Sequence, residues 1–490
     1  MFNWKCLGIL SLIFCLMLSI GRAQDKYKGG TAPDSHDLKY KTDLEFAKLL
    51  KKDWMKADML PGLVADSKPK PITVPVAEVP ESQMTSLEET FERSRPVEEI
   101  EFVEPAPPPE SPPIVKRPLP IKPLNMRKLE FTFFGTPVEI NYDPTLVAYV
   151  GNRIDNQSIS SFWDTVSRAD YGKFLEEADY YRVKMNLNDW GYGIFLHQAA
   201  KAIYPESANG ATLLTWYLLV KSGFDARVGY NGDRVFLLLP SSYVWYETPR
   251  FTVGSNTYYV APFSENIGHI GSLYVYENAY PGAEKPIDVK IIRTPTTIRV
   301  PVERVFKFEY RGQDYTVVAK YNKPIVEFFD AYPQTDLAVY FSASLSPEAG
   351  YSLLNALEPI IKDRSEAEAV NILLRFVQTA FSYKTDADQF GREKFLFPEE
   401  TLFYPYCDCE DRAVLFAFLV RSLTGLEVIG LDYPGHVATA VKFNDPIPGD
   451  FVLFKAQRYT ICDPTYVNAE IGMCQPRYRD ITPEIVKTGI

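Results

Sequence analysis

The sequence predicts an α+β protein whose core is a cysteine-bearing helix packed on an antiparallel sheet. The apolar run Val414–Val420 closely follows Cys409, and several short β-like segments come after it. A similar order of helix and strands occurs earlier in the chain, so we expect the unit to be duplicated. The expected parts are a signal peptide, a disordered Pro/Glu-rich linker, a first copy, a β-rich bridging domain and a second copy, over residues 1–23, 24–125, 126–270, 271–345 and 346–490.

Composition and charge limit the classes of partner. The 490 residues include 46% hydrophobic side chains, enough for more than one core. The net charge is −11, and loss of a signal peptide containing Lys5 and Arg22 would make it −13. A chain this acidic is not expected to bind nucleic acid.

The N-terminus has the pattern of a secretory signal. Lys5 precedes the apolar stretch Cys6–Ile20, and the small residues Gly21 and Ala23 suit cleavage after Ala23. The stretch is shorter than the ~20 residues that a membrane span needs, so an uncleaved anchor is the weaker alternative. We expect an exported protein, periplasmic or associated with the cell surface, without a transmembrane span in the mature chain.

Residues 24–125 have the composition of an extended spacer. Nine prolines lie between Pro105 and Pro123, and such segments are stiff and hydrated. The short amphipathic piece Leu44–Leu50 suggests a transient helix. The spacer would hold the folded part away from a membrane or would dock a surface or envelope partner, and composition does not separate these two roles.

The expected first copy begins with β-like alternation over Leu129–Tyr142 and continues with helices over Ser158–Leu196. A further helix at Ala211–Lys221 then precedes strands. These strands are expected at Asp225–Tyr230, Val235–Leu239 and Thr257–Val260. In the bridging domain, strands are expected at Ser272–Tyr276, Asp288–Ile292, Phe306–Tyr310 and Tyr315–Ala319.

The second copy repeats the order at an offset of 200 residues, at which Leu219–Ser222 faces Leu419–Ser422. Helices over Leu353–Phe381 precede the cysteine helix. The strands after it are expected at Glu427–Leu431, Val437–Phe443, Phe451–Phe454 and Tyr459–Cys462. Chance similarity between two units of helix and strands is the alternative to duplication.

Four cysteines remain after cleavage of the signal, namely Cys407, Cys409, Cys462 and Cys474. In an oxidising compartment, Cys407 could pair with Cys462 or Cys474. Four thiols could also bind zinc, but a single residue between Cys407 and Cys409 is too short a spacing for a zinc knuckle. We therefore expect neither a metal nor another cofactor.

Cys409 combines with two other residues into a candidate site. A thiol at a helix N-terminus meets a positive partial charge, which favours the thiolate. Such a nucleophile needs a base and a group that orients the base. Of the four histidines, only His436 opens a strand after the cysteine helix, and Asp463 follows a later strand end. His36 lies in the leader, His197 follows an apolar helical run and His269 lies in a Gly-rich connection.

The residues Asp408-Cys409-Glu410-Asp411, Gly435-His436-Val437 and Cys462-Asp463-Pro464-Thr465 resemble the motifs of the transglutaminase-like superfamily, which has the papain-type fold. The match is closest to exported bacterial members and covers roughly residues 365–470. The resemblance implies that 346–490 is a catalytic domain in which Cys409 is the nucleophile, His436 the general base and acid, and Asp463 the orienting carboxylate.

The resemblance also implies a thioester intermediate that is resolved by water or an amine. The backbone N–H of Cys409 would contribute to an oxyanion hole. The second donor stays open among Gln378, Gln389, Tyr404 and Tyr406. In the first copy, Asn209 faces Cys409, Arg234 faces His436, and Ala261 or Pro262 faces Asp463, so this copy would be degenerate.

Two functions of different classes follow. The first is an exported cysteine hydrolase or acyltransferase, a peptidase or amidase acting on protein or peptide amides, with hydrolysis favoured because water is abundant. The second is a catalytically silent binding or scaffolding protein that keeps the fold, since the first copy would already have lost the three residues.

Overall fold

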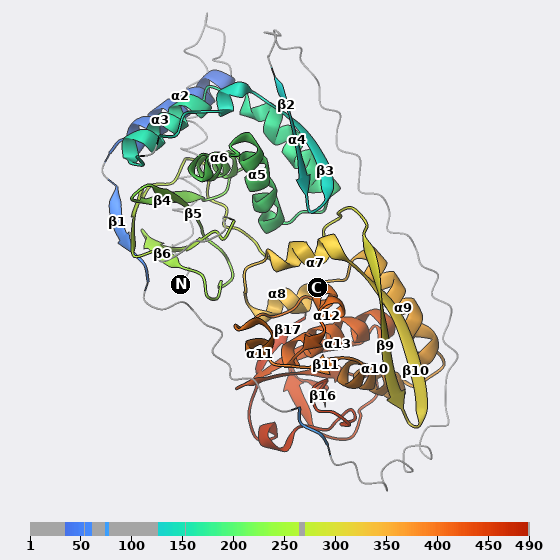
Figure 1. The fold of residues 1–490 in the computed structure, drawn as a ribbon. Helices are drawn as coiled ribbons and strands as arrows, with labels where there is room; N and C mark the ends of the chain where they lie inside the picture. The colour runs from blue at the N-terminus through green and yellow to red at the C-terminus, as the bar shows by residue number, and fades with distance from the viewer. Residues whose placement is uncertain are drawn as a thin grey trace, which may run out of the picture.

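The computed structural model describes residues 35–52, 54–60, 74–77, 126–151, 153–263 and 270–488. They form two parts in which helices pack on antiparallel sheets (Figure 1), which confirms the α+β class. The expected signal peptide lies outside the described residues. No described helix combines the length and the apolar character needed to cross a membrane.

The first part contains a hairpin, four helices and a six-stranded sheet. Its last helix is buried along most of its length and leads directly into the sheet. The elements are β2 (Arg127–Phe133), β3 (Thr136–Tyr142), α3 (Asn156–Val166), α4 (Tyr171–Lys184), α5 (Asp189–Ile203), α6 (Ala208–Lys221), β4 (Arg227–Asn231), β5 (Arg234–Leu239), β6 (Arg250–Val253), β7 (Asn256–Val260) and β8 (Ser272–Val275). The strand order is β1-β8-β4-β5-β7-β6.

The N-terminal region also supplies elements to this first part, so the prediction of a disordered linker over 24–125 is wrong there. Helix α2 (Ser35–Leu50) packs beside α3, and β1 (Met55–Asp58) pairs with β8 at one edge of the sheet. Phe46 and Leu50 are buried, and a buried ion pair joins Asp43 to Lys221 of α6. The prediction was wrong because it relied on the average composition of residues 24–125, which is dominated by Pro and Glu. That average does not reveal α2, whose apolar side chains pack on the core of the first part. The rest of the range, apart from 74–77, lies outside the described residues.

The expected β-rich bridging domain over 271–345 is also wrong. Strand β8 completes the first sheet, and no strand forms at the expected Asp288–Ile292. Two long strands form a hairpin, β9 (Pro301–Tyr310) and β10 (Gln313–Asn322), that packs on helices of the second part. Two short helices follow, α7 (Lys323–Asp330) and α8 (Leu337–Ser342). The alternating patterns were identified correctly, but alternation does not tell which sheet a strand joins.

The second part places one buried helix against a five-stranded sheet. Its helices and short parallel strands are α9 (Pro347–Ile361), α10 (Glu366–Ala380), β11 (Ser382–Tyr383), α11 (Asp386–Phe390), α12 (Pro398–Phe403), β12 (Tyr406–Cys407) and α13 (Cys409–Thr424). The sheet strands are β13 (Glu427–Tyr433), β14 (His436–Lys442), β15 (Phe451–Phe454), β16 (Gln457–Cys462) and β17 (Glu484–Lys487). Their order is β15-β16-β14-β13-β17, and all pairs are antiparallel.

The two sheets share one strand order. In each part a buried helix, α6 or α13, is followed by five strands. Numbered from that helix, the strands lie across the sheet as fifth, first, second, fourth and third in both parts. The first sheet differs by the addition of β1 beyond its fifth strand. A hairpin also precedes the helices in each part, β2–β3 in the first and β9–β10 in the second.

Candidate active site

Cys409 is the first residue of α13, as the sequence predicted. The helix begins after strand β12, where the side chain of Asp411 accepts a hydrogen bond from Asp408 N at 3.1 Å and from Leu396 N at 2.8 Å. It ends at Gly425, whose φ of +71° suits a glycine C-cap. Every residue from Cys409 to Val420 is buried. The thiol is therefore fixed at the positive end of a helix inside the protein.

The Cys409 sulfur has an acidic neighbour. Its Sγ donates to Glu410 Oε2 over 3.1 Å. A carboxylate beside the sulfur repels the negative charge of a Cys409 thiolate, but it attracts the positive charge of a nearby imidazolium. For a thiolate–imidazolium pair, these two effects of Glu410 oppose each other. Cys409 itself is fully buried.

His436 opens strand β14 directly after a two-residue turn. Tyr433 pairs with His436 across the turn, which consists of Pro434 and Gly435. Gly435 has a φ of +75°, and this conformation after a proline is typical of a type II turn. The imidazole is fully buried, and its Nε2 lies 2.8 Å from Asp463 Oδ2.

Asp463 immediately follows strand β16, whose last residue, Cys462, pairs with Thr439 of β14. Its other oxygen, Oδ1, accepts from Thr465 N at 2.9 Å and from Tyr466 N at 3.1 Å. Burial would raise the pKa of Asp463, but the charge of His436 and these hydrogen bonds hold it below its ordinary value. An ionised Asp463 can only accept, so Nε2 of His436 carries a proton.

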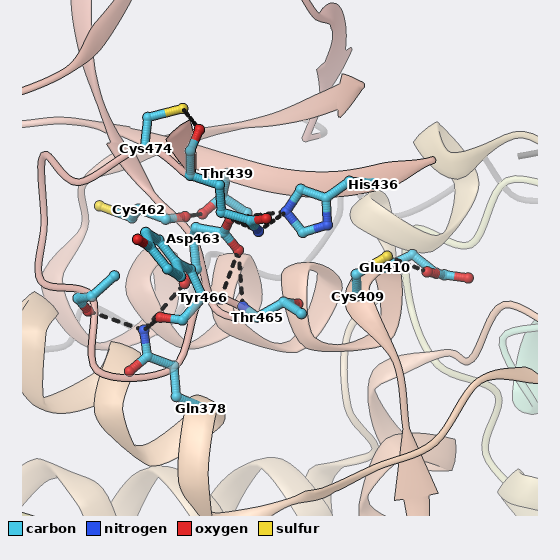
Figure 2. Close-up of polar contacts among 12 residues, drawn as sticks. Gln378, Cys409, Glu410, His436, Thr439, Cys462, Asp463, Thr465, Tyr466 and Cys474 are labelled. Carbon is cyan, nitrogen blue, oxygen red and sulfur yellow. Dashed lines mark hydrogen bonds and ion pairs between the residues drawn. The ribbon is translucent and has the colours of Figure 1, made fainter. Parts of the chain in front are cut away.

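The three predicted residues come together at one end of the sheet. In Figure 2 the His436 ring lies between Asp463 on one side and the sulfur of Cys409 on the other. The ring nitrogen opposite Asp463 is Nδ1, which is buried and accepts or donates no hydrogen bond within the described part of the chain. Its lone pair is therefore available on the side of the thiol.

Two residues at this site were not predicted from the sequence. Gln475 is buried, and its Nε2 lies 2.7 Å from Asp463 Oδ2 and 3.0 Å from His436 Nε2. Tyr478 stacks on the His436 ring with centroids 5.0 Å apart and an interplanar angle of 11°. Both lie after β16, at the two ends of the short 3-10 helix Pro476–Tyr478, where neither periodicity nor spacing relates them to a histidine on another strand.

Gln378 of α10 supports the loop after Asp463. Its amide nitrogen donates to the carbonyl oxygens of Asp463, Tyr466 and Ala469 at 3.1, 2.8 and 3.0 Å. These bonds occupy the donor, so Gln378 is not suited to be the second oxyanion donor. The hydroxyl of Tyr404 donates to Asp330 Oδ1 at 3.5 Å.

The other three cysteines are free, buried thiols, and no disulfide joins Cys407 to Cys462 or Cys474. Burial raises the pKa of Cys407 and of Cys474 to about 11, and it raises that of Cys462 further. His197 is a core residue, with Nδ1 3.0 Å from Thr215 Oγ1. Neither Cys407 nor His197 is placed to take part in chemistry at Cys409.

Acidic side chains gather behind Cys409, and some are close enough to share a cation. Burial and then the charges of Asp411 and Glu410 raise the pKa of Asp386 to about 10, so this carboxyl is protonated at neutral pH. None of the groups of potential ligands among the described residues contains more than one cysteine, which removes the basis for a four-thiol zinc site. The groups are Asp408–Cys409–Glu410, Asp386–Asp408–Asp411 and Asp386–Glu393–Glu410.

The site is closed in this structure. Cys409 and His436 have no exposed surface, and Asp463 is 2% exposed. A carbonyl carbon cannot reach the sulfur unless covering side chains move. Comparisons of the chain with protein-family models, with curated proteins and with solved structures gave no match.

Proposed function

We propose that the protein is a cysteine-dependent hydrolase or acyltransferase of the transglutaminase-like type, with a papain-like second part, that acts on protein or peptide amides. One observation carries the proposal: His436 is bonded to Asp463 at 2.8 Å through Nε2, while Nδ1 is directed to the side of Cys409 at a helix N-terminus. This is the arrangement that a thiol nucleophile, a base and an orienting carboxylate require.

The chemistry would proceed in two steps. His436 Nδ1 takes the Cys409 proton, and the thiolate attacks the amide carbonyl carbon to form a C–S bond. The carbonyl oxygen becomes an oxyanion near the backbone N–H of Cys409. The C–N bond then breaks, and the leaving amine takes the proton from His436, which leaves a thioester. Water or a second amine then gives a proton to His436 and attacks the thioester carbon. The C–S bond breaks, the product leaves, and the Cys409 sulfur takes the proton back from His436.

We also propose that the two parts are copies of one unit and that the first is degenerate. The shared strand order supports this, as does the sequence offset of 200, at which Asn209, the second residue of α6, faces Cys409, the first residue of α13. The side chain of Asn209 bonds Asp233 O at 2.6 Å and Val235 N at 3.0 Å, so the first turn of α6 contacts the start of β5. Asn209 supplies no thiol, and Ala261 after β7 no carboxylate.

The alternative is a catalytically silent binding or scaffolding protein. The complete burial of Cys409 and His436 is the observation that favours it. In either case we propose that the protein is exported and that its partner is a protein or peptide, with a surface or envelope partner for the proline-rich segment.

The test is selective alkylation of the purified protein at pH 6, followed by mapping of the labelled cysteine by mass spectrometry. An ordinary thiol with a pKa of ~8.5 is almost fully protonated at that pH. We expect rapid labelling of Cys409 in the wild type and a loss of at least about tenfold in His436→Ala. Cys407→Ser is the matched control, because it changes a thiol two residues away and should leave the rate unchanged. Equal labelling rates of Cys409 in the wild type and His436→Ala would contradict the enzyme and favour the silent protein.

A further inference from the structure

Asp463 Oδ2 is shared by two donors. It is 2.8 Å from His436 Nε2 and 2.7 Å from Gln475 Nε2. Gln475 is 3% exposed, so solvent does not compete for its amide. Oδ1 accepts hydrogen bonds from two backbone N–H groups. Both oxygens of Asp463 are therefore hydrogen-bonded, and one of the donors to Oδ2 is the side-chain amide of Gln475.

The hydrogens on His436 Nε2 and on the Gln475 amide determine the protonation state of Asp463 that this arrangement requires. An amide nitrogen only donates, and Nε2 of His436 also donates while it carries the proton shared with Asp463. The 3.0 Å separation between these two nitrogens is therefore a contact between donors that converge on one oxygen. A proton on Oδ2 would compete with these two donors, and a proton on Oδ1 would compete with the backbone N–H groups of Thr465 and Tyr466. The full set of four hydrogen bonds therefore requires the ionised carboxylate.

Gln475 is fixed by its own turn. Its carbonyl oxygen accepts from Tyr478 N at 2.9 Å, so the amide and the ring stacked on His436 are held by the same few residues. The turn is anchored through Asp450, whose Oδ2 accepts from Cys474 N at 3.1 Å and from Arg479 Nη2 at 3.3 Å. The segment thus contacts His436 at its edge and on its face.

We propose that Gln475 is a positioning residue that keeps Asp463 ionised and so maintains the tautomer of His436 in which Nδ1 can accept the proton of Cys409. This inference rests on the proposed function of the site. Loss of the amide would let Asp463 take up a proton at a higher pH, and the imidazolium that stabilises the Cys409 thiolate would lose its counter-charge. The predicted effect is on the pH dependence of thiol reactivity.

Other titratable groups around the site would not produce the same dependence. The thiols of Cys462 and Cys474 and the phenols of Tyr433 and Tyr478 all face Asp463, and burial raises the pKa of each above its ordinary value. They stay neutral between pH 5 and 8. Glu410 adjoins Cys409 from α13 and is unchanged by substitution at Gln475.

The test is the pH profile of Cys409 alkylation by iodoacetamide in the purified protein. Gln475→Met keeps the length and volume of the side chain and removes the donor. We expect the midpoint of the profile to rise by about one pH unit, with about tenfold slower labelling on the acid side and the wild-type rate at high pH. Gln457→Met, at an exposed position on β16, is the control and should keep the wild-type midpoint.

The outcomes separate the two proposals. A wild-type midpoint near 8.5 that His436→Ala does not change would contradict the proposed function itself. A low wild-type midpoint that Gln475→Met leaves unchanged would overturn only the role of Gln475. Equal thermal melting of Gln475→Met and wild type shows that a shifted midpoint does not come from partial unfolding. If Gln475→Met melts early, the two profiles are compared at a temperature at which both proteins remain folded, and an unchanged midpoint there overturns the role of Gln475.

Discussion

The four cysteines among the described residues are all free and buried, and they differ in what surrounds each thiol. Cys407 and Cys462 donate only to backbone oxygens, at 3.9 and 3.6 Å, and burial raises the pKa of both. Cys409 differs because it lies at a helix N-terminus and faces His436 (Figure 2). The histidine beside its sulfur therefore distinguishes Cys409 from the other thiols.

The carboxyl of Asp386 gives a prediction at the same scale. Its pKa of about 10 in the folded protein lies well above the unfolded value of ~3.9. The stability that it contributes is thus complete below about pH 4 and is lost as the pH rises toward 10. Asp386→Asn removes this dependence and can still accept from Lys394 N, a bond of 2.7 Å in the wild type.

We expect Asp386→Asn to raise the free energy of unfolding by an amount of order 1–3 kcal/mol at pH 8 and by less at pH 5. Thermal melts between pH 5 and 9 measure this difference. Asp388→Asn, on the exposed side of the same helix, is the control and should give no pH-dependent gain. A difference between Asp386→Asn and wild type that stays constant with pH would contradict the raised pKa.

At the scale of elements, α2 shows how a segment that looks like part of a linker becomes structural. A helix of this length is marginal alone, and its stability comes from packing. Phe46 lies 4.8 Å from Trp163, centroid to centroid, and Trp54 lies 5.2 Å from Tyr230. These contacts bind the N-terminal region to the first part of the molecule.

Two adjacent leucines in α2 test this assignment. Leu50 is fully buried, whereas Leu49 is 37% exposed. We expect Leu50→Ala to lower the free energy of unfolding by about 2–5 kcal/mol and Leu49→Ala to lower it by less than about 1 kcal/mol. Chemical denaturation of both variants measures the values. Equal, small effects would mean that α2 is not packed in solution.

At the scale of the whole molecule, the N-terminal region contacts both parts. After β1 joins the first sheet, residues 74–77 pair with the second part, where Ala77 N donates to Val467 O at 2.8 Å and Val467 N donates to Pro75 O at 2.9 Å. Val467 belongs to the loop that follows Asp463. The support of that loop therefore comes from α10 through Gln378 and from residues far earlier in the chain.

The closed site leads to a prediction about access. Because Cys409 has no exposed surface, any reagent must wait for an opening, and a larger reagent needs a larger and rarer one. We expect iodoacetamide to label native Cys409 at least about tenfold faster than a bulky polymer-linked iodoacetamide does. Labelling in denaturant, where Cys409 is accessible to both, corrects for intrinsic reactivity. Equal corrected rates in the native protein would show that the site is open in solution.

The sequence by itself determined α13, most strands of both sheets and the order of Cys409, His436 and Asp463. These features depend on local patterns, since an apolar run of helical length needs a core and alternation needs a sheet. The similarity at an offset of 200 residues also pointed to two units with one plan, and the two sheets do share a strand order.

Only the tertiary structure decided which distant segments meet. Three contacts join residues far apart in the chain: β1 lies beside β8 in one sheet, Val76 pairs with Val467, and Gln475 and Tyr478 converge on His436. Such contacts depend on the path of the backbone through the fold, and no local pattern encodes that path. The physical reason is that hydrogen bonds act only over about 3 Å. The contacts of Gln475 with His436 and Asp463 therefore exist only because the fold brings these side chains together.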